Sequence, residues 1–309
     1  MVTANDITVI IPLYNKRAEI ASTLRSVLEQ SVQPREIIVV DDGSTDGSAE
    51  VVESMATPIV RLIRQQNSGV SAARNRAMRE ATTRWVSLLD GDDMWGEEYL
   101  ATIVAMINRW PHCGAYSTAF YIDDGQQRVV AAHCGKEGVV DFFKESMTRY
   151  VLIPSATTLQ RELALEVGGF PVGMRMGEDQ YLWTKIARRS DVAFTPQPHV
   201  IYSRAASNRS AAIYRAEQSE FSLEDLYDEQ CSEISNEYVA RVALGKALVE
   251  SARGGTEAAA RALRIFSYNR LSKRTERKVR ILNSLPKAMR PTVLWLYNAL
   301  AWAIARKGL

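Results

Sequence analysis

Hydrophobic and polar positions alternate in blocks along the first hundred residues. Short apolar runs predict buried strands, and the segments between them carry apolar side chains at helical spacing. The predicted strands cover residues 7–12, 36–40, 60–63 and 85–89, and the predicted helices cover residues 18–30, 48–55 and 70–81. Strands that alternate with helices favour a parallel, doubly wound α/β sheet. Ligands of such sheets bind beyond the carboxyl ends of the strands, so polar residues at those ends are candidates for a site.

Beyond residue 95 the pattern becomes mixed. It predicts a strand over residues 114–121 with a hairpin partner over 128–132, and helices over 161–167 and 178–189. From residue 215 onward the pattern is almost entirely helical. We therefore predict an α/β domain over residues 1–210, with halves at 1–100 and 101–210, and a helical region over 211–309. The boundary is expected between residues 207 and 215.

The formal net charge of +2 hides an uneven distribution. From Arg261 to the C-terminus there are twelve Lys or Arg and one acid, Glu276, so this segment carries about +11 and the preceding residues about −9. Such a segment predicts contact with an anionic surface. Three cysteines without paired spacing, and no apolar signal segment before Ile7, lead us to expect a cytoplasmic protein.

An acidic cluster follows the fourth predicted strand. The apolar run from Trp85 to Leu89 leads into Asp90, Asp92 and Asp93, three carboxylates within four residues. Like charges at such density are unfavourable unless a cation lies near them, and carboxylate oxygens suit Mg²⁺ or Mn²⁺ carrying a diphosphate. We therefore predict these three aspartates as metal ligands. The alternative is a solvated acidic turn, in which the intervening glycine supplies the bend.

Polar residues at the other strand ends fit a nucleotide. Tyr14 offers a ring to a base, Asp42 can accept a hydrogen bond from it, and Arg74 can pair with a phosphate. Asn15 and Asn67 lie in the same polar clusters. Each of the first three residues also has an ordinary structural explanation: packing for Tyr14, a turn or helix cap for Asp42, and a solvated helix face for Arg74.

The motifs of several other enzyme classes are missing from the sequence. There is neither a P-loop nor a Rossmann glycine fingerprint, which argues against ATP hydrolysis and dinucleotide redox chemistry. The three histidines, His112, His133 and His199, lie far apart, and none adjoins a nucleophile motif. A hydrolytic triad is therefore not expected.

Four motifs occur together in the order and spacing of one enzyme family. They are Val9-Ile-Ile-Pro12-Leu-Tyr14-Asn15, Val39-Val-Asp41-Asp42-Gly43-Ser44-Thr45-Asp46, Asn67-Ser-Gly69-Val-Ser-Ala-Ala-Arg74-Asn75 and Leu89-Asp90-Gly91-Asp92-Asp93. Together they resemble the family 2 glycosyltransferases, which have a GT-A fold. The resemblance is close over residues 5–100 and weaker to about residue 205, through segments 168–170, 177–179 and 202–210. The last hundred residues show no such resemblance.

The resemblance implies how a nucleotide sugar is held. Pro12, Tyr14 and Asp42 match the family residues that hold the base, with uridine the usual case. Asp90 and Asp92 match the Asp-x-Asp motif, which contacts the ribose and the divalent cation that bridges the diphosphate.

The resemblance also implies a general base. Asp179 matches the acid that removes the proton of the acceptor hydroxyl while the sugar is transferred with inversion, and the adjacent Glu178 is the alternative. A sugar hydroxyl is a poor nucleophile, so a carboxylate within about 3 Å is needed to take its proton. Both acids also suit an ordinary helix N-terminus.

The sequence departs from the family pattern in two places. Many members carry a histidine shortly after a Tyr-Arg segment, whereas residues 202–209 contain none, and we expect Arg204 or Arg209 to hold the diphosphate instead. The Gln-x-x-Arg-Trp motif and the membrane spans of processive members are also missing. Transfer of a single sugar is therefore predicted.

The basic C-terminal segment has an apolar stretch over residues 293–305, which contains two tryptophans and one tyrosine and is too short to span a bilayer. Together with the surrounding cations it predicts that residues 261–309 lie on an anionic membrane surface. The alternatives are packing on the catalytic domain or on a second copy in a homodimer. No recognised nucleic-acid-binding motif accompanies the basic residues, so nucleic acid is not an expected partner.

These observations predict a metal-dependent, inverting glycosyltransferase of the hexosyltransferase class. It would use Mg²⁺ or Mn²⁺ and transfer one sugar from a nucleotide-sugar donor, with a UDP-sugar the first expectation. The expected acceptor is a glycan or lipid-linked glycan of a bacterial surface polysaccharide or lipopolysaccharide, at the inner face of the cytoplasmic membrane. Two alternatives stay open: a sugar nucleotidyltransferase, and a membrane-docked scaffold with a silent nucleotide-binding fold.

Overall fold

The computed structural model describes the chain except for residues 56, 134, 206–218, 291, 294 and 297–309. The chain forms two compact units, Met1–Phe221 and Ser222–Leu309. The whole of the predicted boundary, 207–215, lies outside the described residues.

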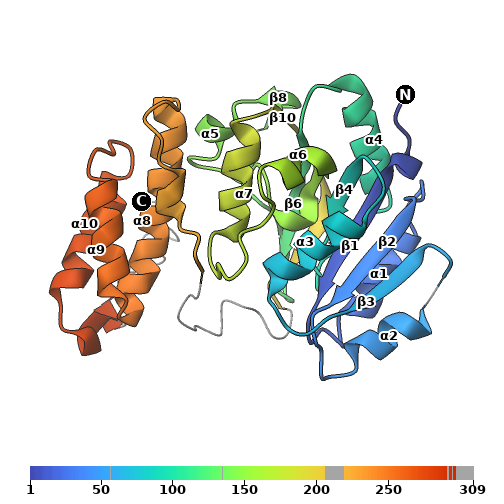
Figure 1. The fold of residues 1–309 in the computed structure, drawn as a ribbon, viewed down its shortest axis with the longest axis horizontal. Coiled ribbons are helices and arrows are strands. Elements are labelled where there is room, and N and C mark those ends of the chain that lie inside the picture. The colour runs from blue at the N-terminus through green and yellow to red at the C-terminus, as the bar shows by residue number, and fades with distance from the viewer. Residues whose placement is uncertain (56, 134, 206–218, 291, 294, 297–309) are drawn as a thin grey trace. The chain divides into compact units, whose positions relative to one another are not determined.

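A ten-stranded sheet forms the centre of the first unit (Figure 1). Its main path runs β3-β2-β1-β4-β9-β6-β10-β5, with β7 paired to β6 and β8 paired to β10. The strands are β1 (Ile7–Leu13), β2 (Glu36–Asp41), β3 (Val60–Arg64), β4 (Trp85–Leu88), β5 (Met94–Trp95), β6 (Ala115–Asp123), β7 (Arg128–Val130), β8 (Gly138–Val140), β9 (Thr157–Gln160) and β10 (Val192–Ser203).

The first four strands are parallel, as predicted. β1 lies between β2 and β4, and β3 extends the sheet beyond β2. The apolar residues of β1 are buried on both faces, which is the reason that this strand is a continuous hydrophobic run and not an alternating one. The carboxyl ends of β1, β2 and β4 consequently lie at one edge of the sheet.

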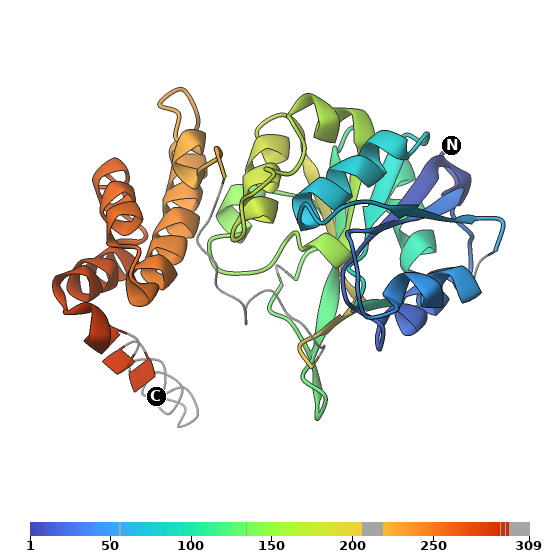
Figure 2. The ribbon, with the colours of Figure 1, turned by 60° about the horizontal axis from the view of Figure 1, so that its bottom comes forward.

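The second half of the sheet is mixed. β9 is antiparallel to both β4 and β6, β10 is parallel to β6, and β5 and β8 are antiparallel to β10. The predicted hairpin is formed by β6 and β7, and it projects beyond the helices of the unit (Figure 2). The sheet therefore confirms the predicted α/β class, while its antiparallel strands β5, β8 and β9 have no counterpart among the predicted elements.

Helices cover both faces of this sheet. α3 packs on β1 and β2 and also contacts α6, which contacts α7, whereas α1, α2 and α4 lie on the other face (Figure 1). The helices are α1 (Ile20–Leu28), α2 (Ser48–Ser54), α3 (Val70–Glu80), α4 (Tyr99–Arg109), α5 (Phe142–Glu145), α6 (Arg161–Glu166) and α7 (Glu178–Ala187).

The second unit is helical, as predicted for this region. Its long helices pack against one another in all three pairings. They are α8 (Glu233–Arg253), α9 (Thr256–Ile265) and α10 (Lys273–Ser284). Their small core includes Leu244, Leu263, Phe266 and Val279, all of which are buried. Across the described parts of both units, none of the helices combines the length and apolar character needed to cross a membrane.

Candidate active site

The parallel topology brings the predicted polar clusters to the same edge of the sheet. Asn15, just after β1, lies beside the loop that follows β2: its backbone N–H donates to Oγ of Ser44 (3.0 Å), and its side-chain oxygen accepts from the backbone N–H of Thr45 (2.8 Å). Asn15 has a φ of 50°, in the left-handed region that Asn tolerates better than most residues. Pro12 and Val40 are register partners on β1 and β2. The end of β1 is thus fixed against the end of β2.

Tyr14 remains available at this edge. Its side chain is 43% exposed, unlike the buried residues of β1 that precede it. A large, exposed aromatic ring directly after a buried strand is placed as a base-stacking ring requires.

Asp42 mainly organises the loop that follows β3. One carboxylate oxygen accepts hydrogen bonds from Nε2 of Gln65 (2.7 Å) and the backbone N–H of Ser68 (2.8 Å), and the other accepts from the backbone N–H of Gly69 (2.7 Å). The side chain of Asn67 donates to the backbone carbonyl of Asp42 (2.9 Å). Asp42 is 3% exposed, and three of the roughly four acceptor positions of its carboxylate are used by these contacts.

The acidic cluster after β4 divides into two parts. Asp93 is only 1% exposed, and both of its oxygens accept hydrogen bonds, from Oγ of Ser155 (2.5 Å) and from the backbone N–H of Ser203 at the end of β10 (2.9 Å). Burial, together with the charges of Asp90 and Asp92, raises the pKa of Asp93. Asp93 therefore holds the two halves of the sheet together, whereas Asp90 and Asp92 keep exposed fractions of 26% and 18%.

Lys16 balances the charge of Asp92. Its Nζ lies 2.7 Å from a carboxylate oxygen of Asp92, and the lysine side chain is 12% exposed. Burial and the charge of Asp90 raise the pKa of Asp92, while Lys16 opposes the increase. Lys16 is absent from the predicted site residues. The sequence feature that could have identified Lys16 is its position directly after the polar end of β1. The sheet topology places that end at the same edge as the acids.

Arg74, on α3, links the acidic cluster to the start of α7. Its guanidinium lies 2.5 Å from Oδ1 of Asp90 and 3.8 Å from Oε1 of Glu178. The side chain is 3% exposed and packs over the ring of Phe170 (5.0 Å to the centroid). Burial would lower the pKa of Arg74, but the charges of Asp90 and Glu178 raise it. Two carboxylates that are 88 positions apart in the sequence therefore face one cation.

The neighbouring Asn75 fixes the chain segment that leads to α7. Its side-chain amide donates to the carbonyl of Phe170 (2.7 Å) and accepts from the N–H of Phe170 (2.8 Å). This is a backbone-like pair of hydrogen bonds, made by one side chain. A Cβ at Gly169 would lie 2.5 Å from Oδ1 of Asn75, so only glycine fits beside this contact. The motifs around residues 74 and 169 are thus two halves of one junction.

Glu178 and Asp179 form the first turn of α7, with Gly177 before them in the left-handed conformation. Burial raises the pKa of both acids, and for Glu178 the charge of Asp179 raises it further. Arg74 lowers the pKa of each. One arginine thus faces three acids, and such a surplus of carboxylates is suited to holding or taking up protons.

Of the two arginines expected to hold a diphosphate, Arg204 is described and Arg209 lies outside the described residues. Arg204 directly follows β10, its side chain is exposed, and its N–H donates to the carbonyl of Asp123 (2.7 Å). The preceding residue, Ser203, is the one that binds Asp93. Arg204 therefore follows the strand end that is tied to the acidic cluster.

The described residues contain no preformed set of three His, Cys, Asp or Glu side chains that would hold a metal ion alone. Asp90 and Asp92 nevertheless offer partly exposed carboxylate oxygens next to each other. Mg²⁺ and Mn²⁺ are commonly bound by one or two carboxylates together with substrate phosphates. The donor set fits such a metal if a diphosphate supplies further oxygens.

Comparisons with known proteins bear on the family and the fold of the chain. The sequence model of "Glycosyl transferase family 2" matches residues 8–184. Glycosyltransferase GlyA of Streptococcus pneumoniae is 28% identical over 235 residues, which cover 72% of this chain and 32% of that protein. The chain spans about a third of the length of the first curated relatives that it matches.

Two solved structures share the fold. S. aureus TarS in complex with UDP-GlcNAc has a TM-score of 0.61 and 22% sequence identity, over 85% of this chain and 73% of that one. The mannosyltransferase PcManGT of Pyrobaculum calidifontis, in complex with GDP-Man and Mn²⁺, has a TM-score of 0.54 and 21% identity, over 96% of this chain and 80% of that one. These likenesses confirm the predicted GT-A fold.

Proposed function

The chain belongs to glycosyl transferase family 2, and from this premise we propose that it transfers a single sugar from a nucleotide diphosphate sugar to a hydroxyl group. The observation that carries the proposal is the placement of Arg74 between Asp90 and Glu178, which joins the acidic cluster after β4 to the acids of α7. A transferase of this kind needs acids for two tasks, and here they share one site.

The nucleotide would bind at the ends of β1 and β2. The exposed ring of Tyr14 would stack on the base beside Pro12, and Asp42 would accept from the base with its remaining acceptor position. Asn15 and Asn67 would help indirectly, by holding the backbone of Thr45 and of Asp42 in place. A UDP-sugar is the first candidate donor, because the TarS neighbour binds UDP-GlcNAc.

Asp92 and Asp90 would hold a Mg²⁺ or Mn²⁺ ion, as the Mn²⁺ in the PcManGT complex suggests. Such an ion supplies Lewis-acid stabilisation of the negative charge on a departing diphosphate. Asp93 is left out of this ligand set, because both of its oxygens are engaged within the protein. Lys16 and Arg204 would supply positive charge near the phosphates, and Lys16 would leave Asp92 when the metal binds.

Asp179 would be the general base. Its carboxylate would take the proton of the acceptor hydroxyl as that oxygen bonds to the anomeric carbon, while the bond from this carbon to the diphosphate oxygen breaks on the opposite side. The configuration of the sugar would therefore invert. Glu178, held against Arg74, would keep its neighbour oriented, and it remains the alternative base.

The proposed setting is the assembly of a bacterial surface polysaccharide or lipopolysaccharide, with a glycan or lipid-linked glycan as acceptor at the inner face of the cytoplasmic membrane. The basic helical unit supports this setting through its charge. A second copy of the chain is the alternative partner of that unit, and sedimentation equilibrium distinguishes the two. Family membership weakens both the nucleotidyltransferase and the scaffold alternatives.

The test of the proposed base is a transfer assay with Asp179→Asn. We expect kcat to fall by about 10²-fold or more, because the proton of the acceptor loses its carboxylate. The matched control is Glu166→Gln, which removes an exposed acid from the end of α6 and should leave kcat within about twofold of the wild type. Full activity of Asp179→Asn would refute the assignment.

A further inference from the structure

The helical unit contains a cavity of about 440 Å³ that no step of sugar transfer uses. Its lining comes from α9 and its C-terminal end, and from α10. The lining residues are Ala260, Leu263, Arg264, Ser267 and Arg280. Ala260, Leu263 and Arg264 fall at helical spacing along one side of α9, and Ser267 lies just beyond the C-terminal end of that helix. The cavity therefore combines an apolar wall with one hydroxyl and two guanidinium groups.

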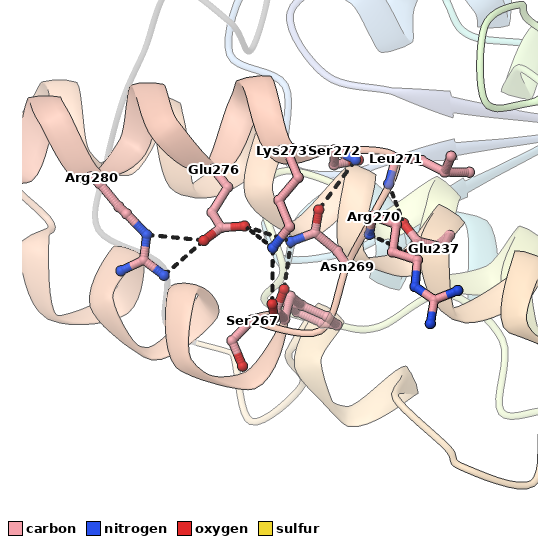
Figure 3. A network of polar contacts seen from close by, with 10 residues as sticks. Glu237, Ser267, Asn269, Arg270, Leu271, Ser272, Lys273, Glu276 and Arg280 are labelled. Atoms are coloured by element: carbon pink, nitrogen blue, oxygen red, sulfur yellow. Dashed lines mark hydrogen bonds and ion pairs between the residues drawn. The ribbon is translucent and has the colours of Figure 1, made fainter.

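One of these guanidinium groups is held in place by a buried carboxylate. Glu276 accepts hydrogen bonds from Nε (3.0 Å) and Nη2 (2.7 Å) of Arg280, and from Nζ of Lys273 (2.8 Å) on its other side (Figure 3). The Glu276 side chain is 9% exposed, whereas that of Arg280 is 54% exposed. Nη1 of Arg280 has no hydrogen-bond partner among the described residues. The guanidinium of Arg280 is therefore held in place, and its Nη1 can still donate to a ligand.

The loop between α9 and α10 is also rigidly built. Glu237, a buried acid on α8, accepts from the backbone N–H groups of Arg270 (2.5 Å) and Leu271 (3.0 Å) (Figure 3). Asn269, which is fully buried, donates to Glu276 (3.0 Å). The cavity thus lies on a preorganised frame, and little ordering is required when a ligand binds.

The charge around the cavity remains positive after the internal pairs are counted. Glu276 offsets only one of the two cations that it binds, and Arg264 makes no ion pair with any described residue. Arg274 and Arg277, exposed on α10, also have no ion-pair partner in the described part of the chain. A dianionic or monoanionic phosphate is the complementary ligand for such a cluster of guanidinium groups.

Exposed apolar side chains occur on α10 and just before it. Leu271, just before α10, is 62% exposed, and Ile281, next to Arg280, is 58% exposed. A soluble phosphate would gain nothing from them, whereas a lipid layer would bury them. Exposed cations and exposed apolar side chains in one segment are typical of segments that lie on an anionic bilayer.

We propose that the cavity between α9 and α10 binds the phosphate group of an anionic membrane lipid. The apolar wall formed by Ala260 and Leu263 accommodates the start of the lipid chain, and Arg264, Ser267 and Arg280 hold the phosphate. This inference shares with the proposed function only the location at a membrane. Lipid binding can be measured without sugar transfer, so the two proposals are tested separately.

The test is cosedimentation of the full chain with vesicles of phosphatidylglycerol and phosphatidylcholine, and with phosphatidylcholine alone. The wild type should bind the anionic vesicles selectively. Arg264→Gln/Arg280→Gln should bind about tenfold more weakly than Arg274→Gln/Arg277→Gln, which removes equal charge from exposed positions of α10 that do not line the cavity. Ala260→Trp, which fills the cavity without changing the charge, should also weaken binding. Circular dichroism verifies that each variant is folded.

Three results would overturn the proposal: no selective binding by the wild type, equal losses in the two arginine pairs, or unchanged binding by Ala260→Trp. Inorganic phosphate, added at an ionic strength matched with chloride, distinguishes a free phosphate from a lipid. Displacement by phosphate beyond the effect of chloride would show a soluble-phosphate site and would contradict the lipid assignment. Transfer to a soluble acceptor should persist in all these variants, so the failure of this proposal would leave the proposed function standing.

Discussion

At the residue scale, the site depends on one buried cation. Arg74 is surrounded by Asp90, Glu178 and Asp179, and it is the cation that lowers the pKa of the two α7 acids. The sequence predicted Arg74 as a phosphate ligand from its place after Asn67-Ser-Gly69. The structure instead places it in ion pairs within the protein, and we propose that it positions the acids. An ion pair over such a sequence separation cannot be read from local spacing.

The pH dependence of activity should reflect these acids. Burial raises the pKa of Asp179, and burial together with the charge of Asp179 raises the pKa of Glu178 to about 8, so both acids should take up protons at a higher pH than exposed carboxylates do. The ionised base is then lost as the pH falls, so kcat/KM of the wild type should decline on the acid side at a higher pH than an exposed aspartate would give. A profile that is flat down to pH 4.5 would contradict the assignment of either acid as the base.

Replacing Arg74 should move that decline. Arg74→Gln removes the charge that lowers the pKa of both acids, so the acid limb of kcat/KM should shift to higher pH, while Arg74→Lys should shift it less. Because the change leaves three partly buried carboxylates without the cation that they share, we also expect a loss of about 3 kcal/mol in stability, which denaturant unfolding measures. Arg79→Gln, exposed on the same helix, is the control and should change neither quantity. A loss of stability without a shift in the profile would show a purely structural role.

At the element scale, the fold follows the sequence closely where the pattern is local. The four parallel strands and their helices could be predicted because each is a continuous apolar run or has helical periodicity, and the hairpin of β6 and β7 followed from adjacent runs. β9 was not predictable: its four residues, Thr157–Gln160, include two buried threonines and a single buried apolar side chain, Leu159. Its antiparallel place between β4 and β6 depends on tertiary pairing alone.

The junction of α3 with the segment before α7 can be tested through its glycine. Gly169→Ala would place a Cβ against Asn75 at a φ of 67°, so we expect a loss of about 2 kcal/mol or more in the free energy of unfolding. Gly245→Ala is the matched control. Gly245 lies within α8 with no atom near its added Cβ, and this change should stabilise by about 0.5–1 kcal/mol. Equal effects of the two substitutions would refute the proposed junction.

The stabilisation that Glu276 provides at α10 should depend on pH. Hydrogen bonds from Lys273 and Arg280 overcome the effect of burial and lower the pKa of Glu276 to about 2. The ionised carboxylate therefore stabilises the folded state above its usual pKa of 4.5, and this contribution is lost as the pH falls toward 2. Glu276→Gln should cost about 1–2 kcal/mol at pH 7 and almost nothing at pH 2, in urea unfolding followed by circular dichroism. A cost independent of pH would contradict this account.

At the scale of the whole molecule, acids from distant parts of the first unit face the same arginine, while the second, helical unit carries the basic segment. The sequence located the acids after β4 and at the start of α7, because both follow recognisable motifs. It did not indicate that Asp93 would turn inward to Ser155 and Ser203, or that Lys16 would face Asp92. Both contacts join segments whose neighbourhood is set by sheet order, and sheet order is not encoded in any single motif.

The most direct test of the separate roles proposed for Asp92 and Asp179 is thermal unfolding in the presence of UDP, Mn²⁺ or both. It compares the wild type with Asp92→Asn and Asp179→Asn. A ligand that binds the folded state raises the unfolding temperature by mass action. The wild type should be stabilised by UDP, and more strongly when Mn²⁺ is present. Asp92→Asn should lose the additional effect of Mn²⁺, whereas Asp179→Asn should keep it. Absence of any response in the wild type, or an undiminished metal effect in Asp92→Asn, would contradict the account.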